Sequence, residues 1–331
     1  MGILINAAVV TVALQFSGFV VAAILQTEVF YDILGGINFL SLAYLGYNNN
    51  YYYSNDDDDN NNNNNLLLHV TTILFVVSRG WLLVFLAWRA HSRKGDSRFD
   101  NVKNNPPMFL IFWMVQACWV FLISMPLLVI QYDNAATTAT AAVVAAVAST
   151  TAIRSSLTVV ELVLLAGFGF AVFMEIISDI QKTLWIQRGR PGGLCTDGFW
   201  SVSRHPNYAG EILQWWCAAG LAIVGWSSSS SSSSSSMETS TSPLGMTLPW
   251  ISLVSPLFTM QILLTMSATG VWNAEGNNLK RYYENDKVRE RYIQYRSKTP
   301  PLFPIPFYES IPLSVKRLLC FEWERYEYKK Q

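Results

Sequence analysis

Polar groups of the kind that carry out chemistry gather in one stretch of the chain, GFWSVSRHPNYAGEILQWW, at residues 198–216. The candidates within it are Arg204, His205, Tyr208 and Glu211. An imidazole, a phenol and a carboxylate can donate or accept protons in enzymes, and a guanidinium pairs with phosphate. Pro206 suits the first turn of a helix, and Tyr208 and Glu211 would share one face of that helix. Because polar groups are costly in hydrocarbon, the cluster predicts burial against other helices or a bound ligand.

A second polar stripe precedes this stretch, in the sequence FMEIISDIQKTLW. Glu175, Asp179 and Lys182 recur at helical spacing, so we expect them on one face of one helix. Taken alone, such a stripe is typical of an ion-pair ladder. Beside the cluster at 204–211, it predicts a polar pocket between two helices that opens to the cytosol.

The loop between these two segments is basic. Arg188 and Arg190 stand next to Gly192 and Gly193, and Arg204 precedes the second helix. The free N–H groups of a helix N-terminus attract phosphate, so this region is a candidate phosphate site. Charge that merely flanks a membrane span on its cytosolic side explains Arg188 and Arg190 equally well.

The composition indicates a membrane protein. Of 331 residues, 51% are hydrophobic and only 14% are charged, whereas ordinary globular domains carry about 25% charged residues. A net charge of zero gives no nucleic-acid footprint. The cysteines are far apart and form no C-x-x-C motif, so we expect neither a disulfide framework nor a metal site; they are Cys118, Cys195, Cys217 and Cys320.

Membrane helices must position the polar residues. Residues 3–25 form an apolar run about 34 Å long as a helix, which is enough to cross a bilayer. The other predicted spans are residues 30–47, 66–88, 108–130, 157–178, 208–226 and 247–272. The predicted fold class is therefore all-α, a polytopic transmembrane helix bundle of about seven spans with a cytosol-facing cofactor pocket.

The loop charges predict the orientation of these spans. Lys and Arg concentrate at 89–103, at 179–205 and after residue 272, whereas 48–65 and 227–245 contain neither. The positive-inside rule places the basic segments in the cytosol. The N-terminus is then lumenal and the C-terminus cytosolic.

Low-complexity tracts complete the predicted domain organisation. Residues 48–65, 135–152 and 227–236 are dominated by Asn and Asp, by Ala and Thr, and by Ser, respectively. Such tracts cannot bury enough apolar surface to order themselves, so they predict disordered lumenal loops. The predicted parts are an N-terminal membrane region with its lumenal loop (1–65), a main membrane domain with inserts near 135–152 and 227–242 (66–312), and a cytosolic basic and aromatic tail (313–331).

Several motifs resemble one family of membrane enzymes. The segments ISDIQKTLW and PGGLCTDGFWSVSRHPNYAGEILQWW are similar to the C-terminal domain of the steroid 5-alpha-reductase family, in the branch called DUF1295. RGWLLVFLAWRAHSRKGDSRFD and KRYYENDKVRERYIQYRSKTPPLFP resemble it too, so the similarity extends over 66–130 and 157–306. It does not reach the substrate-binding N-terminal helices of characterised members, which leaves open whether the lipid is a steroid, a sterol or another molecule.

The resemblance implies a membrane-embedded, NADPH-dependent oxidoreductase that reduces a carbon–carbon double bond of a lipid, with residence in the endoplasmic reticulum. Carried over by motif, the cofactor-binding residues would be Asp179, Lys182, Arg188, Arg190, Arg204 and Asn207. The catalytic candidates are Tyr208, His205 and Glu211.

Two other functions fit parts of the sequence. Isoprenylcysteine and phospholipid methyltransferases also carry R-H-P-x-Y-x-G and bind S-adenosylmethionine. The D-x-Q-K of Asp179–Lys182 and the extension from Asn207 to Glu211 favour the reductase. A non-catalytic lipid-binding membrane protein of the same fold is the third alternative.

Overall fold

The computed structural model describes residues 2–54, 66–93, 99–100, 102–132, 157–232, 247–267, 270–277 and 279–328. All regular elements in these ranges are helices, which confirms the all-α prediction. The helices long and apolar enough to cross a membrane are Gly2–Leu25, Leu66–Arg89, Pro106–Ile123, Val159–Gln187 and Leu248–Thr265. They match five of the seven predicted spans, as expected for an integral membrane protein. Residues 30–47 and 208–226 lie in further helices, so a total of seven spans stays a prediction.

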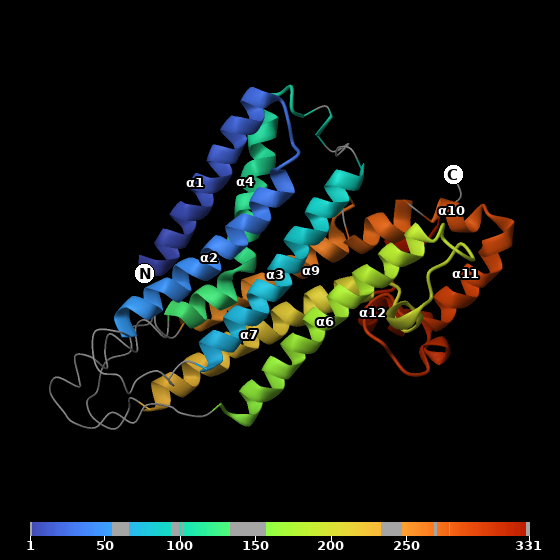
Figure 1. The fold of residues 1–331 in the computed structure, drawn as a ribbon. Coiled ribbons are helices and arrows are strands. Elements are labelled where there is room, and N and C mark those ends of the chain that lie inside the picture. The colour runs from blue at the N-terminus through green and yellow to red at the C-terminus, as the bar shows by residue number, and fades with distance from the viewer. Residues whose placement is uncertain are drawn as a thin grey trace. The chain divides into compact units, whose positions relative to one another are not determined.

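The chain falls into two compact units, of which the first comprises Met1–Ala166 and Trp216–Ser255. Its principal helices are α1 (Gly2–Leu25), α2 (Tyr31–Ser54), α3 (Leu66–Arg93) and α4 (Pro106–Ile123). Helix α2 packs against α1, α3 and α4, and α1 also packs against α4 (Figure 1). The short helix η3 (Leu248–Leu253) also belongs to this unit.

Polar side chains inside the first unit bond across its helices. The Tyr31 hydroxyl donates to the Phe112 carbonyl at 2.8 Å, and the Gln116 amide donates to the Tyr31 carbonyl at 3.1 Å. These bonds tie α2 to α4. Aromatic rings surround them, since Tyr31 and Trp113 meet edge to face with ring centroids 5.0 Å apart. Such bonding satisfies polar groups that hydrocarbon would leave without a partner.

Two low-complexity tracts are partly helical, contrary to the prediction of loops. Helix α2 continues through residue 54, and α7 (Pro206–Ser232) continues into the serine run. The prediction was therefore wrong for 48–54 and for 227–232, because extending a formed helix costs far less than starting one. Residues 55–65, 135–152 and 233–236 lie outside the described ranges.

The second unit comprises Gly167–Trp215 and Pro256–Gln331. It contains the later part of α6 (Val159–Gln187), the start of α7 and most of α9 (Val254–Thr265). Its smaller helices are η2 (Gly198–Ser201), the π-helical turn η4 (Trp272–Asn277), α10 (Lys280–Tyr283), α11 (Asp286–Lys298), η5 (Tyr308–Ser310), α12 (Leu313–Leu319) and η6 (Glu324–Tyr326).

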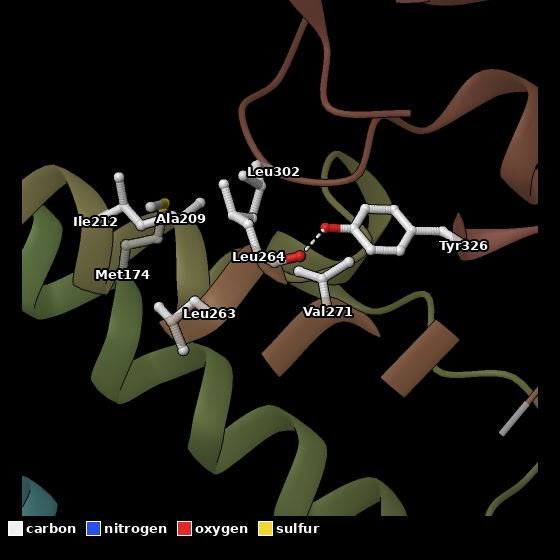
Figure 2. Close-up of a cluster of buried hydrophobic side chains, with 8 residues drawn as sticks. All are labelled: Met174, Ala209, Ile212, Leu263, Leu264, Val271, Leu302 and Tyr326. Atoms are coloured by element: carbon white, nitrogen blue, oxygen red, sulfur yellow. Dashed lines mark hydrogen bonds between the residues drawn. The ribbon is translucent and has the colours of Figure 1, made fainter. Parts of the chain in front are cut away.

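An apolar cluster holds the second unit together (Figure 2). Its buried members are Met174, Ala209, Ile212, Leu263, Leu264, Val271, Leu302 and Tyr326. They come from α6, α7, α9 and the segments that follow. The Tyr326 hydroxyl donates to the Leu264 carbonyl at 2.5 Å, so the last of these segments is fixed to the end of α9.

Candidate functional site

Helices α6 and α7 approach each other closely at Gly210. A Cβ atom at this position would lie 2.8 Å from the carbonyl oxygen of Ala171 and 2.9 Å from the backbone nitrogen of Glu175. Only glycine permits this distance, as at other small-residue contacts between membrane helices. The sequence therefore brings the two polar stripes within hydrogen-bonding reach.

Hydrogen bonds lie on both sides of Gly210. The Asn207 amide donates to Asp179 Oδ1 at 3.1 Å, and the Gln214 amide donates to Glu175 Oε2 at 2.8 Å. The two carboxylates lie about one turn apart on α6 and therefore on one face of it. The stripe thus forms carboxylate–amide bonds between the two helices.

The entry into α7 is held by a proline pair distant in sequence. The backbone N–H groups of Arg204 and His205 donate to the carbonyls of Pro300 and Pro301 at 2.9 and 3.0 Å. The Tyr295 hydroxyl donates to the Trp200 carbonyl at 2.5 Å. Residues 200–205 therefore have a fixed course before the helix begins.

A buried network of charged side chains surrounds Arg204. The guanidinium contacts Glu275 Oε2 at 2.8 Å and also Glu322 Oε2, and its side chain is only 2% exposed. Glu322 also accepts from Arg296 Nη2 at 2.7 Å and from the Tyr308 hydroxyl at 2.7 Å. We call Arg204, His205, Glu275, Arg296 and Glu322 the clasp.

The charges within the clasp shift the pKa values of Glu275 and Arg296. Burial alone would raise the pKa of Glu275, but the charge of Arg204, the hydrogen bond and charge of His205, and the charge of Arg296 lower it to about 2. The pKa of Arg296 is raised, because the two carboxylates outweigh the effect of burial. Glu275 and Arg296 are therefore both charged at neutral pH.

The imidazole and phenol lie next to this network. His205 Nε2 lies 2.9 Å from Glu275 Oε1, so the same carboxylate contacts Arg204 and His205. The Tyr208 ring stacks on the imidazole, with centroids 5.5 Å apart and planes within 11°. Glu211 lies one turn further along α7 and is half-buried.

The remaining predicted residues lie at the end of α6 and in the loop after it. The Lys182 ammonium lies between two indoles, 4.6 Å from the ring centroid of Trp185 and 4.3 Å from that of Trp200. Arg188 and Arg190 are exposed. Arg291 of α11 donates to the Gly192 carbonyl at 3.2 Å and adds a third guanidinium to this loop.

The sequence did not predict the acidic half of the clasp. Glu275 and Glu322 lie 71 and 118 residues after Arg204 and belong to no motif that indicates pairing. Arg296 and Tyr295 stand in the segment KRYYENDKVRERYIQYRSKTPPLFP, whose alternation of basic and aromatic residues was the available indication.

Two polar atoms of the site have no hydrogen-bond partner within the described ranges. They are Arg204 Nε, a donor, and Asn207 Oδ1, an acceptor, and both are buried. Buried polar atoms are usually paired, so each is available to a bound molecule. No group of three or more His, Cys, Asp or Glu residues that could hold a metal ion occurs in the described part of the chain.

Comparison with known proteins identifies the family. Residues 18–248, more than half of the chain, match the family described as protein of unknown function (DUF1295). No curated protein and no solved structure matches the chain. The match includes the polar residues of α6 and α7 and the whole loop between these helices. The chain therefore belongs to the DUF1295 family.

Proposed function

We propose that the protein is a membrane-embedded, NADPH-dependent reductase of a carbon–carbon double bond in a lipid. The observation that carries this proposal is the pairing of Asn207 with Asp179, which leaves Asn207 Oδ1 buried without a partner. Asn207 lies between His205 and Tyr208 in the chain, and its amide offers one acceptor oriented by the bond to Asp179. Such an acceptor suits the carboxamide N–H groups of a nicotinamide.

The positive groups of the loop fit the rest of the cofactor. Arg204 already contacts two carboxylates in a buried position, so we assign it to holding the site together. Phosphate binding then falls to Arg188, Arg190 and Arg291 at the surface, because guanidinium groups form paired bonds with phosphate oxygens. When bound, NADPH would supply the hydride, and the chain would hold the reacting carbon and deliver a proton.

Tyr208 is the proposed source of that proton. The two rings stack, so the nitrogens of His205 lie in a plane nearly parallel to the Tyr208 ring and do not point at it. His205 Nε2 contacts Glu275 instead. His205 therefore orients Tyr208 in this proposal, and the Tyr208 hydroxyl donates to the second carbon of the double bond. The added hydride and this proton together saturate the alkene.

We further propose seven membrane spans with the site on the cytosolic side. Lys103 lies 3.6 Å from Glu28, and these residues precede α4 and α2, respectively. The contact suggests that α2 and α3 cross and return. The contact between Arg204 and Glu275 suggests the same for α7 and α9. Lipid is then the substrate class that can reach the site from the bilayer, and the endoplasmic reticulum is the proposed location.

Binding measurements on the full-length protein in nanodiscs test the proposal. We expect saturable binding of NADPH, and we expect Asn207→Leu to weaken it about tenfold through loss of one hydrogen bond. Arg188→Ala and Arg190→Ala should weaken binding of NADPH more than binding of reduced nicotinamide mononucleotide, which lacks the adenosine half of the cofactor and its phosphates. The matched control is Arg289→Ala on α11, where the exposed guanidinium pairs with Asp286.

The competing functions give different results. Saturable binding of S-adenosylmethionine without binding of NADPH would overturn the reductase and support a methyltransferase. Absence of binding to either molecule by a monodisperse, folded sample would support a non-catalytic lipid-binding protein.

A further inference from the structure

Helix α12 exposes the side chains that a water-facing helix would bury. Leu318 and Leu319 are 79% and 68% exposed, and Leu313 and Val315 are also exposed. The two cations of the helix, Lys316 and Arg317, are less exposed than these leucines. At 100° per residue, the cations project away from the arc formed by Val315, Leu318 and Leu319.

Specific contacts hold the cations in place. The Lys316 ammonium lies 4.3 Å from the ring centroid of Tyr308, and Arg317 donates to Glu327 at 2.8 Å. Tyr308 is itself anchored to Glu322 of the clasp. The orientation of the helix is therefore built into the fold of the second unit.

The apolar surface extends beyond α12. Phe307 is 85% exposed and adopts a left-handed backbone conformation with φ of 55°. Pro304, Pro306 and Pro312 are also exposed. By contrast, the exposed side chains of α11 are mostly charged or polar. Five large exposed hydrophobic side chains thus fall within residues 307–319, outside the candidate membrane spans.

We propose that residues 304–319 bind the membrane surface by inserting into the interfacial layer of the bilayer. An interfacial helix places leucines and aromatic rings among the acyl chains and keeps cations at the level of the headgroups. The basic residues of α12 and the lack of acidic residues within Leu313–Leu319 suit an anionic leaflet. The Arg325 guanidinium lies 4.5 Å from the ring centroid of Trp323. Arg and Trp are both residue types that favour this layer.

We favour the bilayer over a second protein as the binding partner of residues 304–319, because a protein with membrane-spanning helices is already surrounded by lipid. The chain has five helices suited to cross a membrane, so an adjoining apolar segment can enter lipid without recruiting a partner. This proposal concerns binding to the membrane surface and does not depend on the cofactor or on the reaction.

Fluorescence quenching in nanodiscs of phosphatidylcholine and phosphatidylserine tests this proposal. An environment-sensitive fluorophore is attached at Leu318→Cys in a full-length chain whose native cysteines are replaced. A quencher on the lipid acyl chains should reduce its emission severalfold more than aqueous iodide does. Leu319→Cys provides a second position on the same arc, and Glu290→Cys on the exposed face of α11 is the matched control.

The other outcomes would overturn the proposal. Quenching at 318 by iodide to the same extent as at 290 would mean that α12 faces water. Protection from both quenchers would mean that another protein surface, such as a second copy, covers it.

Discussion

Glu275 joins two other residues of the clasp. Its carboxylate is 3% exposed and contacts both Arg204 and His205. Removing one partner of a buried ion pair costs far more than the pair contributes, because the remaining charge loses its compensation. The stability of the second unit should therefore depend on this carboxylate more than on any surface charge.

We expect Glu275→Gln to lower the free energy of unfolding by about 3–5 kcal/mol, since Arg204 keeps its buried charge and loses one of its two carboxylate partners. Thermal unfolding in detergent, followed by tryptophan fluorescence, measures the change. Glu290→Gln on the exposed face of α11 is the control and should have almost no effect. Equal unfolding temperatures for the two variants would contradict the role assigned to the clasp.

Lowering the pH should remove the contribution of Glu275 to the stability of the folded protein. The pKa of Glu275 falls from an ordinary 4.5 to about 2 on folding, so its contribution is present above pH 4.5 and is lost as the pH falls toward 2. The unfolding temperature of the wild-type protein should drop across this range. In Glu275→Gln this component should be missing, and an unchanged acid response in the variant would contradict the assignment.

Residue types predicted both partners of the Asn207–Asp179 bond but only one side of the clasp. Asp179, Asn207 and His205 were identified because they share a helical face or a motif, and the structure gives each of them a hydrogen-bond partner. Glu275 and Glu322 were missed because pairing across 71 and 118 residues depends on tertiary packing, which a local pattern does not encode.

At the scale of elements, the packing of α6 against α7 rests on Gly210. The hydrogen bonds of Asn207 and Gln214 lie three residues before and four residues after it. Any side chain at 210 would separate the backbones and stretch both bonds together. Helix spacing and the geometry of the proposed cofactor site are therefore linked.

Gly210→Ala should lower the free energy of unfolding by about 1–3 kcal/mol, the usual cost of overpacking. It should also weaken the proposed NADPH binding. Thermal unfolding and nucleotide titration measure the two effects. Gly80→Ala is the matched control, since a Cβ atom there would meet nothing within 4 Å and alanine favours a helix. Equal stability of the two variants would show that the helices accommodate the methyl group.

Apolar periodicity predicted where the helices lie but not where all of them end. The polar residues at 48–54 and 227–232 continue their helices, because propagation continues through residues of moderate propensity once a span has formed. Gly192 and Gly193 lie in a loop between α6 and α7, as predicted, and both adopt positive φ.

At the scale of the whole molecule, the number of membrane crossings determines which loops can meet. Helices α7 and α9 separate the loop before residue 206 from α11. Two crossings return the chain to the same side, whereas one crossing leaves the loop and α11 on opposite sides. A single experiment therefore tests whether α7 spans the bilayer.

An impermeant maleimide should label Asp197→Cys and Lys298→Cys from the same side of sealed vesicles, and that side should be cytosolic because Lys and Arg concentrate there. Both positions are exposed. Labelling of the two positions from opposite sides would mean that the chain crosses the bilayer fewer than seven times, which would contradict the proposed topology. Leu25→Cys, at the exposed last residue of α1, provides the internal reference, since the same topology places this helix end in the cytosol.

The clasp also has a consequence for the synthesis of the chain. Ribosomes release Arg204 long before Glu275 and Glu322, which follow 71 and 118 residues later. During this interval Arg204 has neither of its two carboxylate partners. The clasp can therefore close only after Glu322 has been translated, so the second unit completes its fold late in synthesis.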